Sequence, residues 1–203
     1  MINLNSIPKS ESDLLLNEWG YDLMEEYFQL IKAADFPKDK FMLDVATGTG
    51  RAASILTRLD YCVITGDNNH EFKKESENRI SEKFLHKVQY VKLNLEKIPL
   101  PDNSVDNIVC IDTLHELENP MICLSEIIRI HSVRGKLLIA DFNSVGFDVM
   151  DKNHTTRYNK LHPRGKISSD ELKNILTVKY SDIKEINTKL NEGFIISGKR
   201  KEN

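Results

Sequence analysis

Residues 43–51 read LDVATGTGR, a short apolar run followed by two glycines one residue apart. A glycine-rich turn between a strand and a helix lets the backbone approach a ligand closely, because glycine carries no side chain. The first N–H groups of the following helix are free to bind that ligand. Asp67 stands at the end of the next apolar run, where a carboxylate can accept hydrogen bonds from both hydroxyls of a ribose. This stretch therefore predicts a nucleotide-binding turn.

Apolar runs and helical patterns alternate on both sides of this turn. Strands are predicted at 41–46, 61–65, 88–93, 105–111 and 136–142, and helices at 12–35, 51–59, 71–84, 120–130 and 168–176. Such alternation is typical of a parallel sheet with helices on both faces. Two further β-rich runs, 180–190 and 193–199, are joined by a turn too short for a parallel connection. We therefore expect an α/β fold with a Rossmann-like, doubly wound sheet of seven strands, mostly parallel, ending in an antiparallel hairpin.

The chain is predicted to form a single domain over residues 1–203, because no repeat, low-complexity tract or linker divides it. Within it we expect an N-terminal helical cap at 1–38 and a cofactor-binding core at 39–142. The segment 143–167 is polar, irregular in pattern and basic, and is a candidate substrate lid. Residues 168–203 supply a helix and the terminal hairpin, and the last five residues, KRKEN, are predicted to be a solvated tail.

Composition narrows the classes of function. The 28 Lys and Arg against 31 Asp and Glu leave a formal net charge of −3, so no nucleic-acid partner is expected. Cys62, Cys110 and Cys123 form no CxxC pair and lie in apolar runs, which indicates buried reduced thiols and no metal site. The N-terminus lacks a signal-peptide pattern, and no apolar run approaches the length of a membrane span. We expect a cytoplasmic protein.

Three further motifs follow the glycine turn. They are NLEKIPLPDNSVD at 94–106, TLHEL at 113–117, and EIIRIHSVRGKLLIADF at 126–142. Together with LDVATGTG, they resemble in sequence and order the class I S-adenosylmethionine-dependent methyltransferases, and the ubiquinone/menaquinone-type group in particular. The resemblance covers about residues 41–142. The chain departs from the family pattern in three places: Ala46 replaces a glycine, Asn94 replaces an aspartate, and 132–134 replace a K-P-G loop.

The resemblance implies S-adenosyl-L-methionine as cofactor, S-adenosyl-L-homocysteine as product, and methyl transfer to a small molecule by direct displacement. The positions that match cofactor-binding motifs are Asp44, Ala46, Thr47, Gly48, Gly50, Asp67, Asn68, Asn94, Leu95, Ile111 and Asp112. The Asp44 carboxylate would attract the amino group of the cofactor, and the Asn94 amide oxygen would accept from the adenine amino group. Asp112 either lies beside the same amino group or serves the turn structurally.

Two other functions stay open. GTGRAA at 48–53 also fits the dinucleotide fingerprint GxGxx[GA], which would suit an NAD-linked oxidoreductase. Asp44 disfavours that alternative, because its carboxylate would repel a pyrophosphate placed at the turn. A catalytically silent binding module of the same fold is the third possibility.

Candidates for the acceptor side follow the fourth and fifth predicted strands. His115 has the near-neutral pKa of a general base, and a packing or capping role is its alternative. The basic stretch 151–166 offers His154, Arg157, Tyr158 and His162 for binding a small, anionic substrate. A solvated basic loop is the alternative there. The sequence chooses neither the accepting atom nor the oligomeric state.

Overall fold

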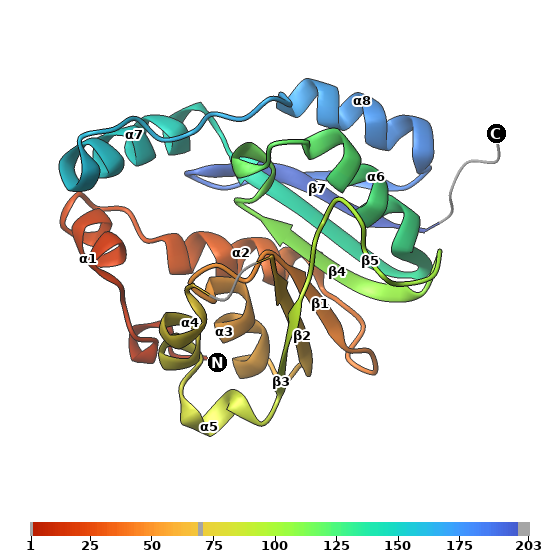
Figure 1. Ribbon diagram of the computed structural model, residues 1–203, viewed down its shortest axis with the longest axis horizontal. Helices are drawn as coiled ribbons and strands as arrows, with labels where there is room; N and C mark the ends of the chain where they lie inside the picture. Colours follow the sequence, from red (N-terminus) through yellow and green to blue (C-terminus); the bar gives the residue numbers. More distant parts are fainter. Residues whose placement is uncertain (1, 69–70, 199–203) are drawn as a thin grey trace.

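A computed structural model describes residues 2–68 and 71–198 and contains one seven-stranded sheet (Figure 1). The strands are β1 Met42–Val45, β2 Val63–Asp67, β3 Val88–Lys92, β4 Val105–Ile111, β5 His131–Phe142, β6 Ile183–Asn187 and β7 Asn191–Ser197. Their order is β3-β2-β1-β4-β5-β7-β6, with β7 antiparallel to both neighbours and every other pairing parallel. The predicted fold class is confirmed.

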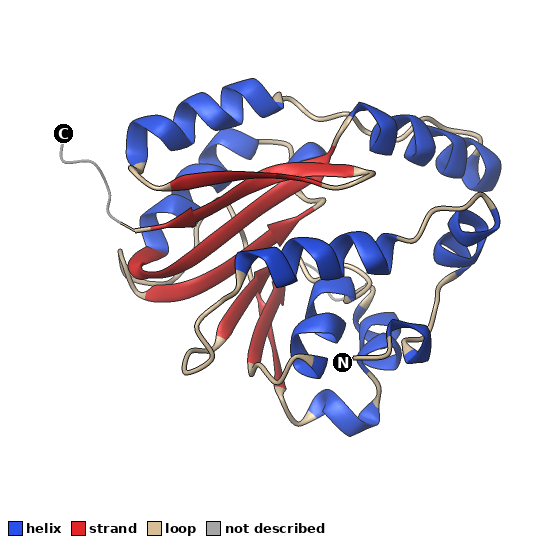
Figure 2. Cartoon of the chain, turned by 180° about the vertical axis from the view of Figure 1, so that it is seen from behind, coloured by secondary structure: helices blue, strands red, loops and turns tan. Residues whose placement is uncertain are grey.

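Helices cover both faces of the sheet (Figure 2). They are α1 Glu11–Glu18, α2 Leu23–Ala34, α3 Arg51–Arg58, α4 Lys73–Ile80, α5 Glu82–Leu85, α6 Pro120–Ile130, α7 Ser144–Tyr158 and α8 Ser169–Lys179, with 3-10 turns η1 Leu4–Ser6 and η2 Leu114–Glu116. The apolar sides of α6 and α8 pack on one face, and those of α2 and α3 pack on the other. In the described part of the chain, no helix is both long and apolar enough to cross a membrane.

The N-terminal helix predicted over 12–35 is two helices. Gly20 adopts a left-handed conformation (φ +81°) between them, and the Asp22 carboxylate accepts the N–H groups of Met24 and Glu25 at the start of α2. The helical pattern continues through this break, so periodicity alone did not reveal it. The helix predicted over 71–84 is likewise divided, at Ser81, whose φ is 70°.

The polar segment 143–167 is not irregular, because it contains the fifteen-residue helix α7. Asn143 caps this helix by accepting the Gly146 N–H, and Val149 and Met150 provide its small buried side. With only these two large apolar side chains buried, the apolar spacing of the segment is too weak to predict a helix from the sequence. Three smaller expectations also need correction. β5 starts at His131, directly after α6, and not at residue 136, and the final hairpin turns at 188–190 and not after residue 190. Cys62 is exposed and not buried. The predicted tail lies outside the described residues.

α1 and α7 lie side by side beyond the carboxyl ends of the parallel strands (Figures 1 and 2). The Ser12 hydroxyl donates to the Asn153 amide oxygen at 3.2 Å, and both side chains are buried. Leu16 of α1 packs in the same apolar cluster as Val149 and Met150 of α7. α1 and α7 therefore form one continuous layer over this end of the sheet.

Candidate functional site

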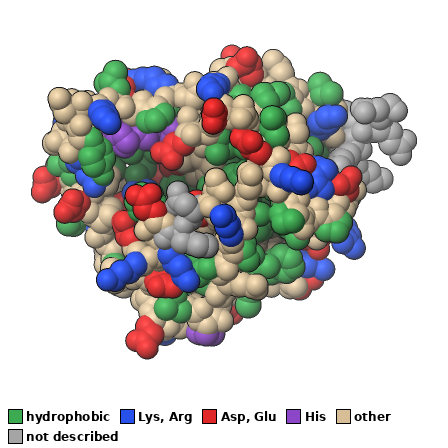
Figure 3. Space-filling view, viewed as in Figure 1, with side chains coloured by type: hydrophobic (Ala, Val, Ile, Leu, Met, Phe, Trp, Pro, Cys, Tyr) green, Lys and Arg blue, Asp and Glu red, His purple; other side chains and the backbone are tan. Residues whose placement is uncertain are grey.

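A cavity of about 590 Å³ opens between this layer and the carboxyl ends of the strands. The space-filling view shows a hollow on this face with histidine side chains at its edge (Figure 3). The predicted site residues that line the cavity are Asp44, Ala46, Thr47, Gly48, Asp67, Asp112, His115, His154, Arg157, Tyr158 and His162. One space thus brings together candidates from both the cofactor side and the acceptor side.

The two glycines of the turn serve different purposes. A Cβ added to Gly48 (φ +46°) would meet nothing within 4 Å, so this position is open to the cavity. A Cβ added to Gly50 (φ +80°) would lie 2.4 Å from Ser76 Oγ, because α4 packs against the turn there. Ala46 is also left-handed, with φ 64°. That conformation explains why a glycine suits this position, since a Cβ there costs roughly 1–2 kcal/mol.

Asp67 stands at the end of β2 and lines the cavity. Its Oδ2 accepts the Gly48 N–H at 3.0 Å, so the carboxylate and the turn hold each other in place. The binding of a ribose by this carboxylate stays a prediction.

Two carboxyl groups, those of the buried Asp44 and the half-buried Asp112, stand at the ends of β1 and β4. Asp44 is 3% exposed and accepts the Thr65 hydroxyl at 2.8 Å, and burial raises the pKa of its carboxyl to about 7. Burial also raises the pKa of Asp112, and the negative charge of Asp141 raises it further. Asp112 Oδ1 accepts from the Asn191 amide, whereas its buried Oδ2 has no hydrogen-bond partner within 2–68 and 71–198. The binding of the ammonium group of the cofactor by these two carboxyl groups stays a prediction.

Five residues predicted to bind the cofactor do not line the cavity: Gly50, Asn68, Asn94, Leu95 and Ile111. Leu95 and Ile111 are buried in the core, and Asn68 is exposed. The Asn94 side chain accepts the Glu96 N–H at 2.9 Å and so stabilises its own turn. Their assignment to the cofactor stays a prediction.

A buried ion network beneath the turn was not predicted. Arg79, only 2% exposed, donates from Nε to the Thr49 carbonyl at 2.8 Å and places Nη1 2.7 Å from Asp13. Arg51, which lines the cavity, donates to the other oxygen of the same carboxylate at 2.9 Å. Asp13 belongs to α1, where it also completes the capping box with Ser10. The network therefore ties the N-terminal cap to the glycine turn.

At the other end of the cavity, three histidines are in contact. The His115 Nδ1 and backbone N–H both donate to the Asp141 carboxylate. His115 Nε2 lies 2.9 Å from His162 Nε2, and His162 Nδ1 lies 3.1 Å from His154 Nε2. Burial lowers the pKa of His115, but the hydrogen bond and charge of Asp141 outweigh it and the net shift is upward. Burial and the neighbouring His115 lower the pKa of His162 to about 3.

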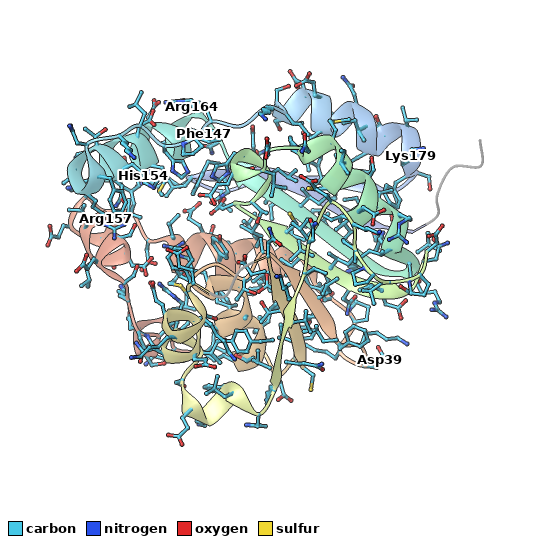
Figure 4. The ribbon with its side chains drawn as sticks, viewed as in Figure 1. Asp39, Phe147, His154, Arg157, Arg164 and Lys179 are labelled. Carbon is cyan, nitrogen blue, oxygen red and sulfur yellow. The ribbon has the colours of Figure 1, made fainter. Side chains whose placement is uncertain are left out.

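The lid segment places its basic side chains near acidic ones. Figure 4 shows His154 and Arg157 on α7 and Arg164 in the segment after it, at the same end of the molecule. Arg164 pairs with Asp148 and Asp151, and Arg157 lies 3.8 Å from Glu11. Asp148 and Asp151 thus place negative charge beside Arg164, and Glu11 does so beside Arg157. Arg164 lines a second cavity of about 240 Å³, which His115 also borders.

Comparison with known proteins agrees with this geometry. Residues 43–139 match a family model described as "Methyltransferase domain". The ubiquinone/menaquinone biosynthesis C-methyltransferase UbiE of Pseudoalteromonas translucida is 28% identical over 148 residues, which are 70% of this chain and 59% of that protein. The chain therefore spans less than two thirds of that relative.

Solved structures show the same fold. A SAM-dependent methyltransferase from Aquifex aeolicus aligns with a TM-score of 0.62 and 25% identity, covering 84% of this chain and 88% of that one. A protein from Methanococcus maripaludis described as a methyltransferase of this kind aligns with a TM-score of 0.63 and 18% identity, covering 97% of this chain and 98% of that one. The family model, the curated relatives and the solved structures thus agree that the chain is similar to the S-adenosylmethionine-dependent methyltransferases.

Proposed function

We propose that this protein is a cytoplasmic enzyme that transfers a methyl group from S-adenosylmethionine to a small molecule. The observation that carries the proposal is the open Gly48 backbone between two carboxyl groups, Asp44 and Asp67, inside one cavity. A pyrophosphate at this turn would meet negative charge, whereas an aminoalkyl group and a ribose would be bound. The geometry thus supports S-adenosylmethionine over a dinucleotide.

In this reaction the residues of the chain bind the cofactor and orient it. S-adenosylmethionine supplies a methyl group on a sulfonium, whose C–S bond breaks with its electron pair left on sulfur as the acceptor attacks. In our proposal Asp67 binds the ribose, while Asp44 and the unpartnered oxygen of Asp112 bind the ammonium group. Orientation of this kind supplies on the order of several kcal/mol toward the barrier.

We place the acceptor between the glycine turn and α7, where His115, His154, Arg157, Tyr158 and His162 line the same cavity. Asp141 orients His115, so that its Nε2 is the atom available for activating the acceptor. Arg157 is the group placed to bind an anionic acceptor. A carbon acceptor, as the name of the UbiE relatives indicates for those proteins, is one candidate class among others.

Calorimetric titration tests the proposal against its two alternatives. We expect S-adenosylhomocysteine and S-adenosylmethionine to bind with one-to-one stoichiometry and NADH not to bind. Phenols, enols, thiols and amines are then supplied as acceptors, and S-adenosylhomocysteine formation is measured. Binding of NADH alone would favour the oxidoreductase, and cofactor binding without turnover of any acceptor class would favour the silent module.

A further inference from the structure

Two buried histidines and one carboxylate converge where the chain after α7 returns to η2. His115 and His162 are 6% and 4% exposed, and their Nε2 atoms lie 2.9 Å apart. Glu116 Oε1 lies 3.8 Å from His115 Nε2, and one ligand atom from each of the three residues lies within 4.8 Å of the others. All three residues line the larger cavity, so a bound species there would be accessible to a substrate.

The contacts of Asp141 indicate which ring nitrogen of His115 can bind a metal ion. Its carboxylate accepts from Nδ1 and from the backbone N–H of the same residue. Nδ1 therefore carries the proton, and Nε2 presents a lone pair toward His162. A carboxylate on the far nitrogen is the usual outer partner of a metal-binding histidine, because it fixes the ring and makes the ligand nitrogen more basic.

The backbone around His162 is held against His115 by contacts of its own. The His162 N–H donates to Asp151 Oδ1 at 2.8 Å. Gly165 is left-handed (φ +81°), and a Cβ there would lie 2.7 Å from His115 Cα. Only glycine allows both that conformation and that approach. The rings of Phe142 and Phe147, centred 5.4 and 5.5 Å from the His115 ring, form apolar walls beside it.

We propose that His115 Nε2, His162 Nε2 and the Glu116 carboxylate bind one divalent transition-metal ion, with Zn²⁺ as the first candidate. In a tetrahedral zinc shell with bonds of about 2.0–2.1 Å, neighbouring ligand atoms lie about 3.3 Å apart. The separations of 2.9 and 3.8 Å lie on either side of that value, and the widest separation in the set, up to 4.8 Å, requires a rotation of the exposed Glu116 side chain toward the histidines. Three protein ligands leave one position for a molecule in the cavity, as in zinc sites that act on substrates.

The use of this ion in catalysis rests on the proposed function. Held by these residues, the ion would lower the pKa of a hydroxyl or thiol bound at its open position, which would then give its proton to water and keep the attacking lone pair. His115 would then act as a ligand and not as the proton acceptor. The acceptor class that this site selects is accordingly a hydroxyl or thiol compound that can reach the ion from the cofactor side.

The test is titration of chelator-treated protein with Zn²⁺ by calorimetry and with Co²⁺ by visible absorption, whose d–d bands report the coordination geometry. We expect one site, and a loss of at least about 100-fold in affinity for His115→Ala and His162→Ala. Glu116→Gln and the outer variant Asp141→Asn should each lose about 10–100-fold. His86→Ala is the matched control, because this histidine is exposed on another part of the surface and should leave binding unchanged.

Circular dichroism and the melting temperature of each metal-free variant separate lost ligands from lost folding. Equal affinity of the unmodified protein and the His115→Ala/His162→Ala double variant would overturn the metal site, as would weak binding of several ions. S-adenosylhomocysteine titrations of the same variants keep the two proposals apart. Zinc binding without S-adenosylhomocysteine binding would support the metal site and overturn the proposed function. S-adenosylhomocysteine binding without zinc binding would support the proposed function and overturn the metal site.

Discussion

Binding of S-adenosylhomocysteine should release a proton from Asp44. This carboxyl is 3% exposed, and burial raises its pKa to about 7, although the Thr65 hydrogen bond opposes the shift. Near neutral pH the free protein therefore holds this group about half protonated. The ligand carries the same ammonium group as the cofactor, and a cation beside the carboxyl favours its charged form.

The structure sets the size and the direction of the effect. An opposite charge within about 4–6 Å lowers a carboxyl pKa by roughly 1–3 units. For a shift of about two units, the bound form would titrate near pH 5. Affinity should then rise almost tenfold per pH unit between about pH 5 and 7, which corresponds to about 1.36 kcal/mol per unit. Above pH 7 the affinity should level off, because Asp44 is already charged in the free protein.

Calorimetry at pH 6 and pH 8, in two buffers of different ionisation enthalpy, measures the protons released on binding. We expect close to one proton at pH 6 and close to none at pH 8. Asp44→Asn keeps a partner for Thr65 but cannot ionise, so its binding should be weaker at pH 8 and release no proton at pH 6. Asp39→Asn, the same substitution at an exposed carboxylate outside the cavity, is the control that should keep the proton release. An unmodified protein without release, or undiminished release in Asp44→Asn, would refute this reasoning.

Three further changes test other parts of the structure. Asp67→Ala should weaken S-adenosylhomocysteine binding by about 1.5–3 kcal/mol in calorimetry, the range for hydrogen bonds to a charged group, and unchanged affinity would exclude ribose binding there. Gly48→Val should abolish that binding, because a branched side chain would stand in the cavity at φ +46°, and normal binding would show that the cofactor lies against another turn. Asp13→Asn removes the closer acidic partner of the buried Arg79 and leaves only the more exposed Glu75, 3.7 Å away, so urea unfolding should show a loss of about 3–5 kcal/mol. A loss under about 1 kcal/mol would mean that the network contributes little.

The succession of strands and helices in the core could be predicted because each motif of the core is local. LDVATGTG contains the end of β1 and the turn within one stretch, and the Rossmann-like fold class follows from the alternation around it. Elements outside the core were harder. Gly20 breaks a helical pattern that is otherwise continuous, and α7 buries only two large apolar side chains, Val149 and Met150. Where packing and not periodicity decides the structure, sequence patterns miss it.

The residues of the site likewise divide into those that local sequence predicts and those whose position depends on packing. The places of Asp44, Gly48 and Asp67 in the cavity were predictable because the three residues lie in consecutive elements of the chain. His115 and His162 were each candidates, but their contact spans 47 residues and depends on the Gly165 backbone pressing against η2. Arg79 is a charged residue in a polar helix, which normally indicates solvent exposure. Its burial beneath the turn follows from the position of α1, which no local pattern encodes.

Backbone strain marks the two strand ends that face the cavity. Ala46 and Asp112 both have left-handed conformations, φ 64° and 50°, at the ends of the neighbouring strands β1 and β4. Such conformations cost roughly 1–3 kcal/mol each and persist only where the surroundings enforce them. Asn191 of β7 holds Asp112 in place, and the Asp13–Arg79 pair holds the turn that follows Ala46. The carboxyl groups of the cavity are thus fixed before any ligand arrives, which removes their ordering entropy from the free energy of binding.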